Sequence, residues 1–150
     1  MNIKKLIDFN NHCKKKKKYF YLANYPKIAI KLSLNGVYIP SFNKKINLIT
    51  GKPRNFLVLG SAHNLPQIRV KEKQGAECIF LAPLFLTKKS DNFLNICNFK
   101  ILSNQTNKKV IALGGLKKNN IGRIKLLNIH GYASISLFKL VASFIGKYIF

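Results

Sequence analysis

Three stretches of the chain have the composition of strands that are buried on both faces of a sheet. They are residues 56–59, 78–82 and 110–113, and each is a nearly continuous run of apolar residues. Such runs are typical of a parallel sheet with helices outside it. In these folds, ligands bind in the loops that follow the carboxyl ends of the strands. The loops after the three stretches are therefore the first candidates for a functional site.

Those three loops carry groups that suit an anion. Their hydroxyl, imidazole, ammonium and glycine positions are Ser61, His63, Thr87, Lys88, Lys89, Gly114 and Gly115. Hydroxyl and ammonium groups donate hydrogen bonds, and glycine lets backbone N–H groups approach a ligand closely. Because the carboxyl ends of parallel strands meet at one edge of a sheet, we expect these groups to converge on a phosphate.

The rest of the chain alternates helical and extended patterns with short links. We expect strands at residues 19–22, 37–39, 56–59, 78–82, 110–113 and 131–135. Helical patterns cover residues 3–11, 27–32, 44–50, 65–74, 93–104, 119–127 and 137–148. Pro26 opens one of these helices, and Asn64 and Gly75 are the expected cap and stop of another. Strands that alternate with helices predict βαβ crossovers and one parallel sheet, so residues 1–150 are expected to form a single domain.

The chain has a net charge of +23, which is compatible with a polyanionic partner. The excess is spread over helical and turn segments alike. Only Arg54, Arg69 and Arg123 are arginines, the residue that best reads bases and phosphates. Lysine, isoleucine and asparagine are all abundant and have AT-rich codons, so genome composition explains the balance. We interpret the lysines at residues 14–18 as a solvated helix end, and a basic nucleic-acid-binding module is the alternative.

The cysteines and the apolar segments bear on the cellular compartment. Cys13, Cys78 and Cys97 form no C-x-x-C pair, which argues against a zinc site or a disulfide framework and fits a reducing compartment. We interpret Cys78 and Cys97 as small core residues. No stretch approaches about eighteen apolar residues, and the first residues lack the apolar segment of a signal peptide. These patterns predict a cytoplasmic protein without a membrane partner.

Five segments resemble, in order and in spacing, the motifs of one enzyme family. Residues 35–39 are similar to its DGVHL strand, 60–64 to GxSxHS, 82–87 to GPVFPT, 112–116 to AIGGI and 131–136 to GVAVIS. On these motifs the chain resembles the thiamine phosphate synthase/TenI family. The resemblance implies an α/β fold, a TIM-type (β/α)8 barrel that is incomplete: about six βα units, with the first two missing. Six strands leave two open edges: a homo-oligomer or an upstream extension of the chain would cover them, or the protein is a degraded form of the barrel.

The resemblance also implies an activity and a role for each site residue. Synthases of this family join a hydroxymethylpyrimidine diphosphate to a thiazole phosphate and release pyrophosphate, whereas the TenI branch consists of thiazole tautomerases. Three residues would act in catalysis, at the diphosphate: Ser61, Thr87 and Lys89. Five would bind the substrate and its phosphate: Lys88, Gly114, Gly115, Ile135 and Ser136. By the same resemblance His63 holds its loop through a hydrogen bond, with acid–base catalysis as the alternative.

Two departures from the family pattern concern its magnesium ion and its tautomerase chemistry. The family's magnesium aspartates fall on Asn24 and Asn43, and neutral amides bind a hard cation much less well than carboxylates do. Mg²⁺ is therefore implied by the resemblance alone, and we assign no metal ligand. The TenI catalytic histidine falls on Pro83, and the Arg and Lys on the synthases' second strand have no counterpart. The chain is predicted to have little or no synthase activity.

These observations leave several functions open. The first is a synthase-like protein of thiamine biosynthesis that binds a phosphorylated thiazole, whether or not it couples it to the pyrimidine diphosphate. Another is a non-catalytic protein that binds a phosphate ligand or a thiamine precursor. A TenI-like tautomerase and a basic nucleic-acid-binding module are the remaining alternatives.

Overall fold

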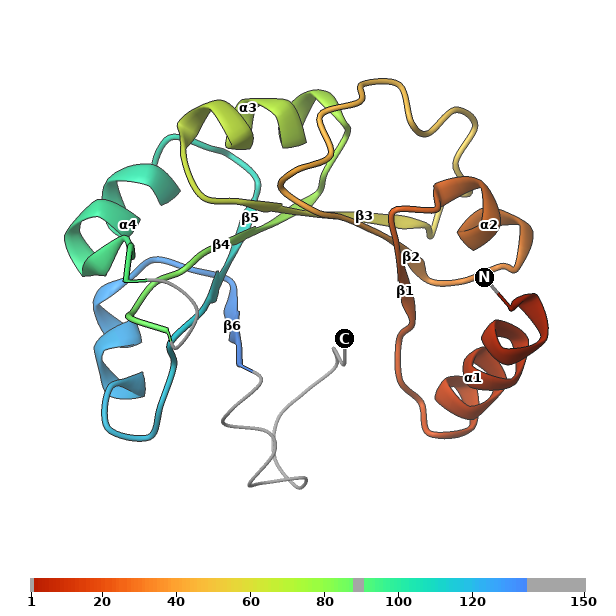
Figure 1. The fold of residues 1–150 in the computed structure, drawn as a ribbon, viewed down its shortest axis with the longest axis horizontal. Coiled ribbons are helices and arrows are strands. Elements are labelled where there is room, and N and C mark those ends of the chain that lie inside the picture. Colours follow the sequence, from red (N-terminus) through yellow and green to blue (C-terminus); the bar gives the residue numbers. More distant parts are fainter. Residues whose placement is uncertain (1, 88–90, 135–150) are drawn as a thin grey trace.

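The computed structural model describes residues 2–87 and 91–134, which fold around a six-stranded parallel sheet (Figure 1). The strands are β1 (Tyr21–Ala23), β2 (Gly36–Ile39), β3 (Leu57–Ala62), β4 (Cys78–Leu81), β5 (Lys109–Leu113) and β6 (Gly131–Ala133). Each pairs in parallel with the next along the chain. The sheet curves into an arch, and in the described residues its end strands, β1 and β6, are not paired with each other. This arrangement confirms the prediction of an incomplete α/β barrel.

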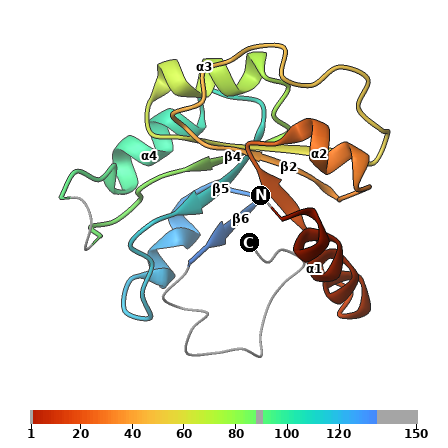
Figure 2. The same ribbon diagram turned by 45° about the vertical axis from the view of Figure 1, so that its right-hand side comes forward.

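The helices of the described residues lie mainly on the convex side of the arch. They are α1 (Ile3–Lys15), α2 (Pro26–Lys31), α3 (Leu65–Lys73), α4 (Asn95–Ser103) and the 3-10 helix η1 (Ile121–Leu126). Two views show α2, α3, α4 and η1 outside the sheet, with α1 beside β1 at one end (Figures 1 and 2). None of these helices is long and apolar enough to cross a membrane.

Alternate residues of the strands point into two apolar layers. The main core lies between the sheet and the helices and includes Val37 and Ile79, both fully buried. A smaller layer on the concave side is centred on Tyr21, Leu59 and Phe80. Because side chains alternate between the two faces of a strand, apolar layers on both faces require an uninterrupted apolar run. The two layers thus account for the pattern seen in the sequence.

The predicted signals at both ends of α3 are confirmed. The Asn64 side chain accepts a hydrogen bond from the backbone N–H of Gln67 at 3.0 Å, which satisfies one of the free donors of the first turn. After the helix, Gly75 adopts a φ of +77°, the left-handed conformation that ends many helices. Pro26 also opens α2 as predicted.

Two helical predictions are wrong in detail. Residues 44–50 form no helix: they belong to an irregular loop between β2 and β3, in which Phe42 and Ile46 are 73% and 50% exposed. Asn47 has a φ of +63°, which interrupts any helical turn there. Residues 119–127 give the short 3-10 helix η1 in place of the expected α-helix. Residues 137–148, and the end of the predicted strand 131–135, lie outside the described residues.

The interpretation of Cys97 as a core residue is also wrong. It lies exposed on α4, whose buried residues are Phe99 and Ser103. The helix α4 carries apolar residues on more than one of its faces, and one of them, Ile101, is 61% exposed. The spacing of apolar residues in the sequence therefore did not determine which face of α4 would be buried. Cys78, in contrast, packs in the concave layer, where burial raises the pKa of its thiol to about 11 and makes it unreactive at neutral pH.

Candidate functional site

All six strands are parallel, so their carboxyl ends lie at one edge of the sheet. In the register of the sheet, Ser61 of β3 lies beside Phe80 of β4, and Leu81 lies beside Ala112 of β5. Ser61 is only 6% exposed, and it points to the concave side because it is two residues from Leu59. It is a buried hydroxyl at the end of the strand.

Backbone hydrogen bonds join the loops after β4 and β5. The N–H of Leu84 donates to the carbonyl of Leu113 at 2.9 Å, and that of Phe85 donates to the carbonyl of Gly114 at 3.1 Å. Gly114 and Gly115 have φ values of +95° and +69°, and a Cβ on Gly115 would lie 2.3 Å from the Phe85 oxygen. Only glycine fits this approach. These two hydrogen bonds between the loops use the carbonyl oxygens of Leu113 and Gly114. The N–H groups of Gly114 and Gly115 take no part in them.

Side chains fix the turn that follows the two glycines. The Asn120 Nδ2 group donates to the carbonyl of Gly115 at 2.9 Å, and its Oδ1 accepts from the N–H of Lys117 at 2.8 Å. The hydroxyl of Ser134, just after β6, donates to the carbonyl of Leu116 at 3.2 Å. The turn is therefore tied both to the start of η1 and to the end of the neighbouring strand.

His63 links three loops at the same edge. Its Nδ1 lies 2.6 Å from the carbonyl oxygen of Ala82, so this nitrogen carries the proton and donates. Its Nε2 then accepts from the hydroxyl of Ser41 at 3.1 Å, and its backbone N–H donates to the side chain of Gln67 at 2.8 Å. These bonds agree with the interpretation that His63 holds its loop in place.

The structure describes half of the predicted site residues. Ser61, Gly114 and Gly115 lie at the carboxyl edge, and Thr87 lies, partly exposed, in the segment after β4. Four predicted residues lie outside the described part of the chain, and their roles stay predictions: Lys88, Lys89, Ile135 and Ser136.

Asn24 and Asn43 are brought together although they are far apart in the sequence. Asn24 follows β1, Asn43 follows β2, and the Nδ2 group of Asn43 donates to Oδ1 of Asn24 at 2.7 Å. The Oδ1 of Asn43 accepts from the backbone N–H of Lys45 at 3.0 Å. Asn24 has a φ of +69°, a conformation that asparagine tolerates better than most residues. Each of the two amide oxygens therefore already has an N–H donor.

This pair does not fit a magnesium ion. Mg²⁺ prefers carboxylate oxygens in near-octahedral geometry, whereas here two neutral amides present one shared hydrogen bond and no charge. No group of three or more His, Cys, Asp or Glu side chains suited to a metal occurs in the part of the chain that the structure describes. The side chains described at the ends of β1 and β2 therefore bind each other and do not form a cation site.

Sequence reasoning missed Lys71, a fully buried lysine on α3. Its Nζ donates to the backbone carbonyls of Pro40 and Asn43 at 2.7 and 2.9 Å and to Oε1 of Gln74 at 2.9 Å. Burial lowers the pKa of Lys71 from 10.5 to about 8. The signal available in the sequence was its spacing, since Lys71 comes three residues after the buried Ile68 and so falls on the same face of the helix.

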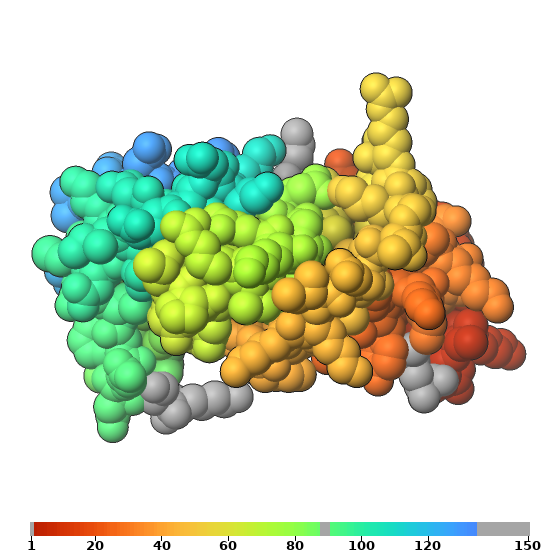
Figure 3. All heavy atoms as spheres, turned by 90° about the horizontal axis from the view of Figure 1, so that it is seen from above, coloured from red at the N-terminus to blue at the C-terminus, as the bar shows by residue number. Residues whose placement is uncertain are grey.

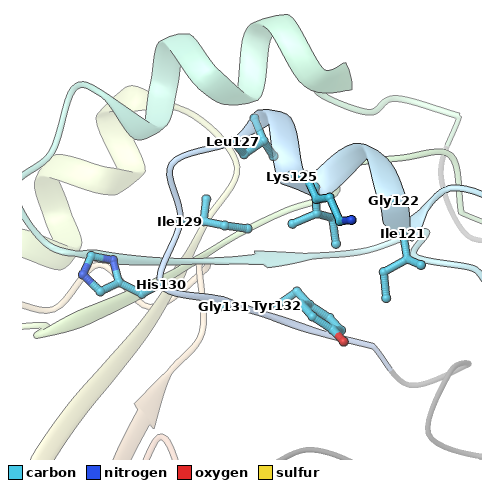
Figure 4. Close-up of a pocket in the computed structure, with 9 residues that line it drawn as sticks. Ile121, Gly122, Lys125, Leu127, Ile129, His130, Gly131 and Tyr132 are labelled. Atoms are coloured by element: carbon cyan, nitrogen blue, oxygen red, sulfur yellow. The ribbon is translucent and has the colours of Figure 1, made fainter.

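A shallow groove lies apart from this edge, between η1 and β6. It is lined by Ile121, Gly122, Ile124, Lys125, Leu127, Ile129, His130, Gly131 and Tyr132 (Figure 4). His130 and Gly131 stand at the amino end of β6, the opposite end from the glycine loop. The groove is therefore not part of the candidate site.

Comparisons with known proteins agree on one family. A family model described as thiamine monophosphate synthase matches residues 3–138. A relative in Aquifex aeolicus is 31% identical over 113 residues, which are 74% of this chain and 61% of that protein. The thiamine-phosphate synthase of Prochlorococcus marinus subsp. pastoris is 29% identical over 139 residues, 91% of this chain and 39% of that protein. The chain thus spans between 39% and 61% of the length of these two relatives.

A solved structure shares the fold. Thiamine phosphate pyrophosphorylase from Pyrococcus furiosus superposes with a TM-score of 0.71 over 90% of this chain and 67% of that one. Since the sequences are 15% identical, the likeness concerns the fold: the curved sheet of Figure 1 is a large part of an α/β barrel.

Proposed function

Because this chain belongs to the thiamine monophosphate synthase family, we propose that it acts in thiamine biosynthesis and binds a phosphorylated thiazole at the carboxyl edge of its sheet. The observation that supports this most is the joined pair of loops after β4 and β5. Their mutual hydrogen bonds engage the carbonyls of Leu113 and Gly114 and leave the N–H groups of Gly114 and Gly115 for a ligand. Adjacent backbone N–H groups are common donors to phosphate.

The remaining predicted residues complete this proposal. Ile135 and Ser136, which follow β6, would add a backbone N–H and a hydroxyl to the thiazole phosphate. Thr87 and the adjoining Lys88 or Lys89 would hold the diphosphate of a pyrimidine substrate, and Ser61 would lie beside it. A phosphate site after the last two strands recurs in barrels of this kind, which is consistent with the placement.

The residues of this chain are poorly suited to the step that couples the two substrates. Departure of pyrophosphate leaves negative charge that must be neutralised, and fixed charges facing it are usually the largest catalytic contribution. Magnesium would supply such charge in this family, but the donor set of Asn24 and Asn43 does not suit the ion. We therefore propose that the chain binds its thiazole ligand and is a poor synthase by itself. Pro83, which lacks a titratable group, likewise argues against tautomerase chemistry.

Calorimetric titration of the purified chain with thiazole phosphate, without magnesium, tests the proposal. We expect saturable binding that Ser136→Ala weakens roughly ten- to a hundredfold, because a hydrogen bond to a charged group is worth about 1.5–3 kcal/mol. The exposed hydroxyl of Thr50 provides the control, and Thr50→Val should bind like the wild type. Absence of binding at millimolar ligand, or equal loss in both variants, would overturn the proposal.

A further inference from the structure

Lys71 is one of the largest fully buried side chains, and no carboxylate of the described residues contacts its ammonium group. Its three partners are the carbonyl oxygens of Pro40 and Asn43 and the amide oxygen of Gln74. A buried charge is costly unless its hydrogen bonds are satisfied. The position of this lysine therefore needs a reason beyond packing, because an apolar residue would fill the same space at lower cost.

The three oxygen partners match the protonated form of the lysine. An ammonium group has three N–H donors and no acceptor, so each donor meets one oxygen. A neutral amine has two donors and a lone pair, and it would leave one of the three oxygens facing that lone pair. The arrangement is thus built around the cation.

The sheet has a slot for the aliphatic part of this side chain. A Cβ on Gly60 of β3 would lie 2.8 Å from Cδ of Lys71, so the missing side chain at Gly60 leaves room for the lysine to pass over β3 on its helix-facing side. Beyond the slot, its Nζ reaches the loop between β2 and β3. The space-filling view shows this loop, in orange and yellow, lying along α3 (Figure 3).

Gln74 reinforces the same contact from the end of α3. Its Nε2 group donates to the carbonyls of Asn43 and Lys45 at 2.9 and 2.8 Å, while its Oε1 accepts from Lys71. The two side chains together engage the carbonyls of Pro40, Asn43 and Lys45. These contacts engage the backbone carbonyl of Asn43, and the side chain of the same residue reaches Asn24 at the end of β1.

We propose that Lys71 is a positioning residue that, together with Gln74, fixes the loop after β2 and thereby holds Asn43 against Asn24 at the carboxyl edge of the sheet. The contacts of the lysine ammonium group with Pro40 and Asn43 are what holds this loop at the edge. The inference concerns the loop itself, so it can fail while the thiazole phosphate proposal stands, and the reverse is also true.

Amide hydrogen exchange measured by NMR on the full chain tests it. The variant is Lys71→Met, which keeps length and apolar volume but removes the donors, and the control is Lys73→Met, an exposed lysine of the same helix. The probes are the N–H groups of Asn43 and Lys45, which bond to Pro40 and to the Asn43 side chain. We expect both to exchange at least about tenfold faster in Lys71→Met and unchanged in Lys73→Met.

The amides of Val58 in β3 and Ile79 in β4, both buried, separate a local effect from a global one. A selective rise at the loop supports the positioning role, and it should be accompanied by a shift of the Asn43 side-chain amide resonance. Unchanged loop exchange, or a rise equal to that of the two strand amides, would overturn it. If Lys71→Met does not fold, Gln74→Met removes two of the loop contacts and must show the same selective rise.

Discussion

The side chains of Asn24 and Asn43 meet at a place where two carboxylates would attract a divalent cation. With amides, the contact is one hydrogen bond of 2.7 Å and carries no charge. With carboxylates at the same distance, each would raise the pKa of the other, and a bound cation would relieve the repulsion. The identity of one atom in each side chain therefore decides what this part of the edge can hold.

From this we predict that the double variant Asn24→Asp/Asn43→Asp gains magnesium binding. Calorimetric titration with MgCl₂ should give an affinity at least about tenfold above that of the wild type, because Mg²⁺ favours carboxylate oxygens over amides. Asn95→Asp/Asn98→Asp, which adds the same charge on α4, is the matched control and should bind no better than the wild type. Equal binding by both double variants would show a general charge effect and contradict the prediction.

The pKa of Lys71 gives a second prediction at the scale of one residue. Burial lowers this pKa to about 8, whereas the unfolded chain keeps the ordinary value of 10.5. Between these values the unfolded state binds more protons than the folded state, so the free energy of unfolding rises with pH in this window. The contribution is at most about 1.4 kcal/mol per pH unit. It is absent in Lys71→Met, whose buried side chain does not titrate.

Urea unfolding of both proteins between about pH 7.5 and 9.5 measures this difference. The free energy of unfolding should rise with pH more steeply for the wild type than for Lys71→Met, because the two proteins share all other titrating groups. Parallel curves would mean that Lys71 does not titrate in this range.

At the scale of elements, α3 packs against β3 where the Lys71 side chain lies over Gly60. Gly60 is needed because a Cβ there would lie within 2.8 to 3.3 Å of three atoms of the Lys71 side chain. We predict that Gly60→Ala destabilises the chain by about 1–3 kcal/mol, the usual cost of overpacking. In Gly60→Ala/Lys71→Ala the two closest of these atoms, Cδ and Cγ, are gone, so the two effects should fall short of additivity by at least about 0.5 kcal/mol in urea unfolding. Strict additivity would show that the two residues do not share the slot.

The accuracy of the sequence prediction also varied from element to element. The ends of α3 were predictable because Asn64 and Gly75 act locally, through one hydrogen bond and one backbone conformation. The loop that contains residues 44–50 was not, since Lys71 and Gln74 contact it at Asn43 and Lys45 from a later part of the chain. For α4 the sequence indicated a helix, but its apolar residues did not distinguish the buried face.

At the scale of the whole molecule, the parallel sheet and its strand order followed from apolar runs that alternate with helices. The carboxyl edge was predictable for the same reason, and Ser61, Gly114 and Gly115 lie there. The hydrogen bonds that join its loops were not predictable, because backbone pairing between two loops leaves no periodic pattern. Within residues 2–87 and 91–134 the end strands β1 and β6 each pair on one side only, and a homo-oligomer that covers them stays a prediction.

The central claim is that this chain keeps the thiazole-binding part of its family's site but is a poor synthase. Loss of one charge-stabilising contact costs about 2.7–4 kcal/mol of barrier, so loss of two should slow catalysis by roughly four orders of magnitude. Purified chain mixed with thiazole phosphate, hydroxymethylpyrimidine diphosphate and magnesium, and assayed for thiamine phosphate, measures this directly. We predict bound thiazole phosphate with little or no thiamine phosphate formed. Turnover within about tenfold of an ordinary family enzyme would contradict the account.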